Sequence, residues 1–272
     1  ARKARDFAEA GGFARHAASY EALLEDPEID AVYIPLPNSM HREWTLRAAA
    51  AGKHILCEKP LALSVAEARE MQAAADANGV VLMEAFMYRF HPRTRALLEM
   101  ARPETLGALR RIRSSFVVRL ARFDNIRFFS SLGGGVLRDL GCYCLDVSRL
   151  VAGTLPVEVQ GLAVWNDDGI DVDFAATLRF PRDLIAQFDC SFLMERREFV
   201  EVAGLDASIS SAAETFVNST NVVDLVERRN RFADRHHMIR GDNHYRLMVE
   251  HFADVALGVA TPQHGIRDSL ED

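Results

Sequence analysis

The chain has 272 residues, of which 49% are hydrophobic and 26% charged, and its formal net charge is −7. A chain of this length and hydrophobic content can bury a large core in one or two domains. The acidic balance disfavours a nucleic-acid binder, which needs clustered Lys and Arg to contact phosphates. A membrane span is not expected, because no apolar run approaches the roughly 20 residues that cross a bilayer.

The first third of the chain alternates short apolar runs with helical segments. The predicted strands are residues 30–34, 54–57 and 80–84, and the predicted helices are residues 2–10, 20–25, 41–51 and 64–78. Ser64 and Glu67 have the spacing of a capping box at the start of the last of these helices. Strands that alternate with such helices predict βαβ units, a parallel sheet and helices on both of its faces.

The pattern changes after Tyr88. The predicted helices are then residues 93–101, 133–152 and 243–257, and the predicted strands are residues 108–120, 157–165, 171–180, 184–193, 199–203 and 207–211. Turn sequences between successive strands predict hairpins, and hence a large, mostly antiparallel open sheet with one face on helices. The predicted fold class is therefore α/β plus α+β. A partial Rossmann-type parallel-sheet domain at residues 1–88 precedes an α+β domain at residues 89–272.

The four cysteines form no CxxC pair and no disulfide framework of the small secreted type. Cys142 and Cys144 lie two residues apart in a predicted helix and therefore point to different faces of it. We expect buried free thiols, which suit a reducing compartment, and hence a cytoplasmic protein. A leader peptide ahead of Ala1 would change that expectation.

The first candidate site is the segment Glu58, Lys59 and Pro60, directly after the second predicted strand. Ligands of open α/β sheets bind beyond the carboxyl ends of the strands. Pro60 restrains the residue before it toward an extended backbone, so that Lys59 can project its ammonium into a cleft. On position alone, a surface lysine in a loop is an equally good interpretation.

The second candidate site is a glycine-rich turn at residues 133–135 and the helix behind it. The spacing of Asp139, Tyr143 and Asp146 places all three on one face of that helix. Polar groups on an otherwise apolar helix are expensive to bury without a purpose, although a solvent-facing stripe is the alternative. Gly141 favours a site, because a glycine inside a helix costs about 1 kcal/mol and leaves room for close packing.

The third candidate site is the turn that contains Pro35, Leu36, Pro37, Asn38 and His41. It ends a predicted strand and opens a predicted helix, so that its backbone N–H groups could line a nucleotide cleft. Asn38 as an ordinary helix cap and His41 as an ordinary first-turn residue are the alternative.

Taken together, residues 32–41, 58–60 and 133–143 resemble the glucose-fructose oxidoreductase and inositol dehydrogenase (Gfo/Idh/MocA) family in order and spacing. Residues 84–92 are similar to its interdomain crossover, and residues 243–252 to its late helix. Many members have His where this chain has Tyr143, and the Tyr form resembles the subgroup of glucose-fructose oxidoreductase, dihydrodiol dehydrogenase and xylose dehydrogenase.

The resemblance implies NAD or NADP as the cofactor, a substrate-binding and oligomerisation role for the second domain, and roles for individual residues. Lys59 would touch both the nicotinamide and the substrate, and Tyr143 would donate or accept the proton. Asp139 is then expected to bind a substrate hydroxyl or to hold Lys59. The implied cofactor-binding residues are Pro35, Leu36, Pro37, Asn38, His41, Glu58, Lys59 and Arg89. No metal is expected, since the His residues form no zinc-type ligand pair.

Family members begin with a strand, a GxGxxG turn, a helix and a second strand, none of which this sequence contains. We therefore expect Ala1 to lie just inside the helix after that second strand, in a natural protein that carries a longer N-terminal segment. That segment would hold the phosphate-binding turn and the residues that select NAD or NADP.

The implied activity is reversible hydride transfer between nicotinamide and a hydroxyl-bearing carbon of a sugar, or of a similar polyol or dihydrodiol. A Lys59 ammonium near Tyr143 would lower the pKa of the phenol from its usual value of about 10. A non-catalytic dinucleotide-binding regulator of the same fold and redox-assisted glycoside cleavage are the alternatives. Alternating apolar positions in residues 175–180 and 185–192 are expected on the outer face of the open sheet, which with the resemblance favours a homodimer or homotetramer.

Overall fold

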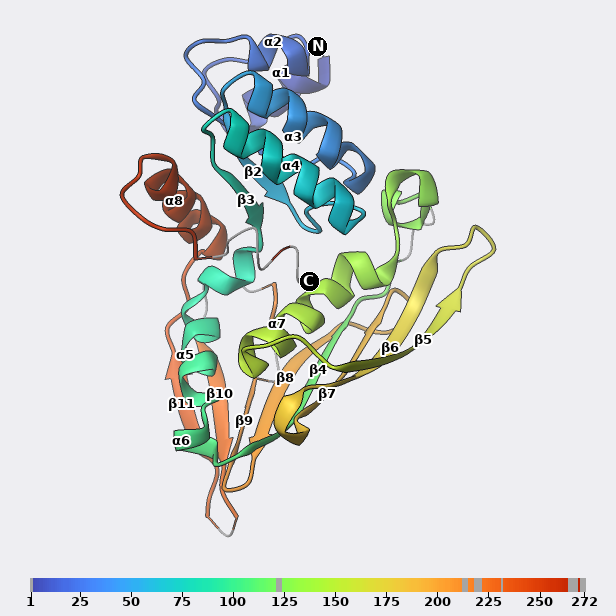
Figure 1. Cartoon of the computed structure of the whole chain (residues 1–272), viewed down its shortest axis with the longest axis vertical. Helices are drawn as coiled ribbons and strands as arrows, with labels where there is room; N and C mark the ends of the chain where they lie inside the picture. The colour runs from blue at the N-terminus through green and yellow to red at the C-terminus, as the bar shows by residue number, and fades with distance from the viewer. Residues whose placement is uncertain are drawn as a thin grey trace.

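The computed structural model describes residues 2–120, 124–211, 215–217, 222–230, 232–263 and 269. Two sheets organise the chain, a three-stranded sheet in its first third and an eight-stranded sheet in the remainder (Figure 1). The described residues form two hydrophobic cores: a smaller one in the first sheet, and a larger one that extends from Leu56, Met83 and Ala85 of that sheet through the crossover segment into the eight-stranded sheet. The predicted combination of a Rossmann-type sheet with a large open sheet is confirmed.

The first sheet is parallel, with the strand order β1-β2-β3. Its strands are β1 (Ala31–Ile34), β2 (His54–Glu58) and β3 (Leu82–Ala85), and its helices are α1 (Arg2–Gly11), α2 (Tyr20–Leu24), α3 (His41–Ala50) and α4 (Val65–Ala77). Helices α3 and α4 form the two crossovers, so the predicted βαβ units are present. The parallel register places the carboxyl ends of β1 and β2 side by side, next to the second sheet.

Helix α4 begins at a cap that differs slightly from the predicted capping box. The Ser64 hydroxyl accepts a hydrogen bond from the Glu67 N–H at 3.3 Å, as the pattern requires. The Glu67 carboxylate, however, accepts from the N–H of Leu63 at 3.0 Å rather than from that of Ser64. The cap therefore also fixes the loop that follows Pro60.

The crossover leaves β3 through a short 3-10 turn, η2 (Met87–Phe90), and enters two helices, α5 (Pro92–Met100) and α6 (Pro103–Leu106). The eight-stranded sheet follows, in the order β11-β10-β9-β8-β4-β7-β6-β5. Its strands are β4 (Leu109–Val117), β5 (Glu158–Trp165), β6 (Asp171–Arg179), β7 (Ile185–Ser191), β8 (Arg197–Gly204), β9 (Ser208–Ser211), β10 (Val223–Arg228) and β11 (Arg235–Ile239). Among the strands that the structure describes in this sheet, β4 and β7 pair in parallel and all other neighbours are antiparallel.

Helix α7 (Cys142–Ala152) lies across one face of this sheet, and α8 (His244–Ala256) lies beside the crossover (Figure 1). The predicted helix over residues 133–152 begins three residues later than expected and is not regular throughout. Residues 133–135 form a turn with positive φ at Gly133 and Gly135, and a π-helical segment, η5 (Leu137–Gly141), precedes α7. The turn is tight because a Cβ on Gly134 would lie 2.3 Å from the carbonyl oxygen of Arg127.

Gly141 lies at the junction of η5 and α7, and its lack of a side chain permits close packing on the sheet. A Cβ there would meet the Cys190 sulfur at 2.9 Å. The predicted tight packing at this glycine is therefore present, although its partner is the protein itself. The expected free thiols are also present, since all four cysteines are unpaired and three of them are buried.

The expected apolar outer face on β6 and β7 is wrong. The alternating apolar positions of both strands are buried toward α7; they are Ala176, Leu178, Phe180, Ala186, Phe188, Cys190 and Phe192. Apart from the half-buried Ile185, the opposite positions carry small or polar side chains, including Thr177, Gln187 and Asp189. Exposed apolar side chains lie instead on the edge strand β5, where Leu162 is 81% exposed. In the part of the chain that the structure describes, no helix has the length and hydropathy of a bilayer-crossing segment.

Candidate active site

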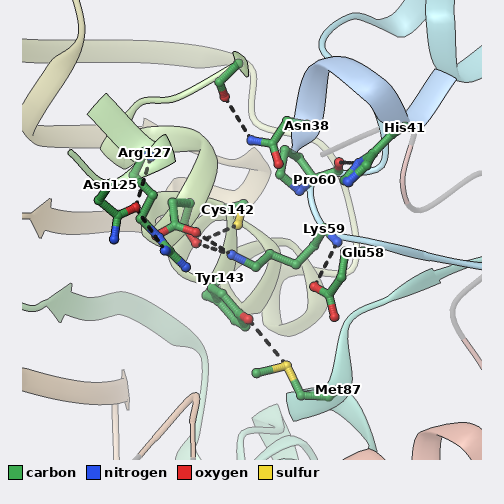
Figure 2. Close-up of polar contacts among 12 residues, drawn as sticks. Asn38, His41, Glu58, Lys59, Pro60, Met87, Asn125, Arg127, Cys142 and Tyr143 are labelled. Carbon is green, nitrogen blue, oxygen red and sulfur yellow. Dashed lines mark hydrogen bonds and ion pairs between the residues drawn. The ribbon is translucent and has the colours of Figure 1, made fainter. Parts of the chain in front are cut away.

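A cleft of about 510 Å³ lies where the carboxyl ends of β1 and β2 meet the start of α7. The first sheet contributes the turn after β1 and the segment after β2, while η2, β4 and the loop after it, η5, α7 and α8 contribute to the other walls. Figure 2 shows Lys59, Arg127, Met87 and Tyr143 of this site. The polar or charged lining residues are Tyr33, Asn38, Glu58, Lys59, Arg127, Asp139, Tyr143 and Tyr245. The apolar lining includes Pro35, Leu36, Met87, Phe116, Val118, Leu120, Ile126, Leu132, Leu140 and Val217.

Lys59 crosses this cleft from the first sheet to the second. It follows the buried strand β2 directly, and its Nζ donates to the Asp139 carbonyl oxygen at 2.6 Å and to Asp139 Oδ1 at 2.9 Å. The same Nζ lies 5.0 Å from the centroid of the Tyr143 ring. The three residues that the sequence assigned to catalysis and substrate binding therefore meet in one place.

Asp139 is held by two cations. Besides Lys59, the Nε of Arg127 donates to Asp139 Oδ2 at 2.5 Å. Burial would raise the pKa of the carboxyl, but the two positive charges outweigh it and hold the pKa below its ordinary value. Burial would likewise lower the pKa of Lys59, but Asp139 holds it above the ordinary value. The pair is thus ionised at neutral pH, with side chains only 11% and 15% exposed.

Tyr143 lies at the bottom of the cleft and is 3% exposed. Its hydroxyl donates to the sulfur of Met87 at 3.3 Å. Burial raises the pKa of this phenol well above its usual 10, so the expectation that Lys59 lowers it is wrong. The ammonium approaches the face of the ring instead of the hydroxyl, and its charge is compensated by Asp139.

Asp146, the third polar residue predicted to share a helix face with Asp139 and Tyr143, points into the protein interior and not into the cleft. It accepts hydrogen bonds from the Tyr88 hydroxyl and from the guanidinium of Arg89, and its side chain is fully buried. Arg89 does not line the cleft, because this ion pair holds its side chain against α7. The structure thus places Arg89 away from the predicted cofactor site.

The turn after β1 divides into cleft-lining and supporting residues. Pro35, Leu36 and Asn38 line the cleft, and the Asn38 amide donates to the Gly133 carbonyl at 2.8 Å, which ties the two domains together. Pro37 starts the 3-10 turn η1 (Asn38–Met40) and is not part of the cleft wall.

His41 is fully buried and also lies outside the cleft wall. Its ring nitrogens lie 2.8 Å from the Leu36 carbonyl oxygen and 3.0 Å from that of Pro60. His41 therefore joins the turn after β1 to the Lys59–Pro60 segment, and it supports the cleft from behind.

The sequence analysis did not single out several residues of the cleft, among them Tyr33, Met87, Arg127 and Tyr245. The Tyr33 hydroxyl donates to Glu58 Oε1 at 2.5 Å and so orients a carboxylate beside Lys59. Its position as the one side chain with a hydroxyl in an apolar strand, next to the strand's last residue, was the available signal. Arg127 precedes the glycine turn without any recognisable spacing.

A small parallel sheet with βαβ crossovers, joined to an open sheet whose long helix brings a tyrosine to the shared cleft, is the architecture of a dinucleotide-binding fold followed by an α+β domain. Residues 1–86 match the model of an oxidoreductase family with an NAD-binding Rossmann fold, and residues 94–210 match the GFO/IDH/MocA C-terminal domain. The chain belongs to the Gfo/Idh/MocA family of oxidoreductases.

Two curated relatives come from the predicted subgroup. The chain is 38% identical over 208 residues to D-xylose 1-dehydrogenase (NADP(+)) 2 of Haloferax volcanii. The aligned region covers 76% of this chain and 64% of the relative. It is 34% identical over 203 residues to trans-1,2-dihydrobenzene-1,2-diol dehydrogenase of Sus scrofa, and the aligned region covers 74% of this chain and 60% of that relative. The chain thus matches less than two thirds of the length of each relative.

Solved structures share the fold over nearly the whole chain. A 3-ketoreductase from Actinomadura kijaniata in complex with NADP and TDP-benzene has a TM-score of 0.90 at 27% identity, covering 99% of this chain and 83% of that one. The aldose-aldose oxidoreductase from Caulobacter crescentus, complexed with glycerol, has a TM-score of 0.89 at 25% identity, with the same coverage.

Proposed function

We propose that the protein is an NAD(P)-dependent dehydrogenase that acts on a CH–OH group of a sugar, or of a similar polyol or dihydrodiol. The observation that carries the proposal is the meeting of Lys59, Asp139 and Tyr143 in a cleft whose other wall is the turn after β1. Relatives that act on D-xylose and on a dihydrodiol support the substrate class.

The residues present suit the nicotinamide end of a dinucleotide. Pro35 and Leu36 offer an apolar surface of the kind that a planar ring packs against, at the strand ends where such ligands bind in open α/β sheets. The Glu58 carboxylate offers an acceptor beside them, and Lys59 a cation. When bound, NAD or NADP supplies or accepts the hydride.

The chain's own residues handle the proton and the position of the substrate. In the reductive direction the neutral Tyr143 hydroxyl donates its proton to the substrate oxygen, and in the oxidative direction the phenolate must accept it. The Lys59 ammonium, 5.0 Å from the centroid of the same ring, offers a positive charge to the reacting oxygen of a substrate in the cleft. Asp139, held by Lys59 and Arg127, keeps the ammonium in place between the two domains.

Three further features belong to this proposal. The division into domains at residues 1–88 and 89–272 is supported by the family models, which meet the crossover from either side.

A homodimer or homotetramer is supported by the exposed apolar side chains of β5, among them Leu162 and Val164, and analytical ultracentrifugation would test it. A cytoplasmic location is supported by four unpaired cysteines.

The alternative function is a non-catalytic dinucleotide-binding regulator. The ionised Lys59–Asp139 pair beside a tyrosine hydroxyl favours the enzyme, because burying such a pair is costly without a use. An absorbance assay at the reduced-nicotinamide band, with D-xylose, other aldoses and cyclic diols, separates the two functions. We expect turnover with at least one substrate and a loss of at least about 100-fold in Tyr143→Phe. Turnover that survives within a few-fold in Tyr143→Phe would remove this residue from the role.

A further inference from the structure

The Tyr143 hydroxyl has an unusual partner for a proposed acid or base. In the described part of the chain its hydrogen bond goes to the thioether of Met87, at 3.3 Å (Figure 2). Sulfur in a thioether is a weak acceptor, whereas a buried tyrosine hydroxyl usually meets an oxygen or water. The contact therefore contributes little to stability, and another explanation is needed for its place in the cleft.

The surroundings of the ring fix the direction of the hydroxyl. The rings of Phe86, Phe116 and Phe216 pack around Tyr143 with centroids 5.2, 5.4 and 5.6 Å away. The Lys59 ammonium covers a ring face. Both Tyr143 and Met87 also line the cleft, so the hydroxyl and the sulfur meet at its wall.

Met87 is itself held in register with Tyr143. The two residues after it, Tyr88 and Arg89, both donate hydrogen bonds to Asp146. Asp146 lies on α7, three residues after Tyr143. Buried, charge-assisted hydrogen bonds thus join the crossover turn to the helix about one helical turn from the contact between the Met87 sulfur and the Tyr143 hydroxyl. They set the separation between that sulfur and that hydroxyl.

A weak acceptor suits a hydroxyl that must change partners. During proton transfer the Tyr143 hydroxyl has to bond to the substrate's reacting oxygen, and it must first leave its resting partner. An amide or carbonyl oxygen in the place of the sulfur would compete with the substrate, while an aliphatic side chain would leave the hydroxyl without a preferred direction.

We propose that Met87 is a positioning residue: its thioether aims the Tyr143 hydroxyl at the cleft and yields it to the reacting oxygen of the substrate. This inference rests on the proposed function, because it assigns the hydroxyl a substrate to meet. Met87 has no chemical role of its own and acts through Tyr143 alone.

The contact is tested first without any turnover. The chain is labelled with ¹³C at its methionine methyl groups, and the Met87 signal is assigned by its loss in Met87→Leu. We expect Tyr143→Phe to shift the Met87 methyl signal and to leave that of Met71, which is buried in the first domain, unchanged. A Met87 methyl chemical shift that is unchanged in Tyr143→Phe would overturn the proposal.

Kinetics with D-xylose, or with whichever substrate the panel yields, tests the positioning role. Met87→Gln introduces a strong acceptor of similar length, and we expect it to raise KM about three- to tenfold. Met87→Leu keeps the bulk and removes the acceptor, and we expect kcat to fall a few-fold with KM within about twofold. Met71→Leu is the matched control. Identical KM values in Met87→Gln and Met87→Leu, in variants with wild-type circular dichroism, would contradict the proposal.

The dehydrogenase activity and the role of Met87 are tested by different results. If the wild-type chain turns over no member of the panel, the proposed function fails. The Met87 methyl signal is then followed while D-xylose is added with NADP. A shift on addition supports the exchange of partners, and its absence at saturating D-xylose counts against the role of Met87.

Discussion

Replacing Asp139 by Asn tests whether the ion pair across the cleft holds Lys59. The amide keeps the size of the carboxylate but removes its charge, and its NH₂ group then faces the Nε of Arg127, which also donates. Hydrogen bonds to charged groups contribute about 1.5–3 kcal/mol each, and Lys59 keeps its 2.6 Å bond to the backbone carbonyl of residue 139. We therefore expect the free energy of unfolding to fall by about 2–3 kcal/mol at neutral pH.

The pH dependence of that loss has a defined sign. The pKa of Asp139 is lowered in the folded protein, so its stabilisation is complete above the unfolded carboxyl pKa of about 3.9 and disappears as the pH falls through the folded value. Urea unfolding of wild type and Asp139→Asn should therefore differ most near neutrality and converge in acid. Glu70→Gln, which breaks an exposed ion pair with Arg42, is the control and should change little. Equal stability of Asp139→Asn and wild type at neutral pH would refute the reasoning.

Two further substitutions probe the frame of the site. Asp146→Asn removes the carboxylate charge that faces the buried Arg89 guanidinium, and thermal unfolding should show a loss of about 3–5 kcal/mol; a loss below about 1 kcal/mol would mean that the pair is not held as described. Gly134→Ala would place a Cβ 2.3 Å from the Arg127 carbonyl, so the turn must shift; we expect kcat/KM to drop at least tenfold, whereas unchanged kinetics would show that the turn does not position the site.

The sequence was sufficient for the parts of the fold that follow local patterns. The apolar runs that became β1, β2 and β3 and the glycine stops between them predicted the parallel sheet. The strands β10 and β11 were missed, because charged and histidine side chains interrupt the alternation in residues 223–228 and 235–239. The π-helical turn over residues 137–141 was also beyond reach, since it depends on how the glycine turn packs on Arg127 and Asp171.

The candidate site divides in the same way. Lys59, Asp139 and Tyr143 were found from strand ends, helical spacing and resemblance, and the structure brings them together. The direction of the Tyr143 pKa was not predictable, because burial arises from aromatic rings in segments as distant as Phe86 and Phe216. For the same reason, Met87 and Arg127 become site residues only through tertiary contacts.

The pH profile of turnover in both directions tests the role of Tyr143 most directly. Because burial raises the pKa of the phenol well above 10, the neutral hydroxyl needed for reduction is present throughout the neutral range, while the phenolate needed for oxidation is scarce. Reduction should therefore be independent of pH near neutrality, and oxidation should rise about tenfold per pH unit up to strongly alkaline pH. An oxidation rate that is flat between about pH 7 and pH 9 would contradict Tyr143 as the base.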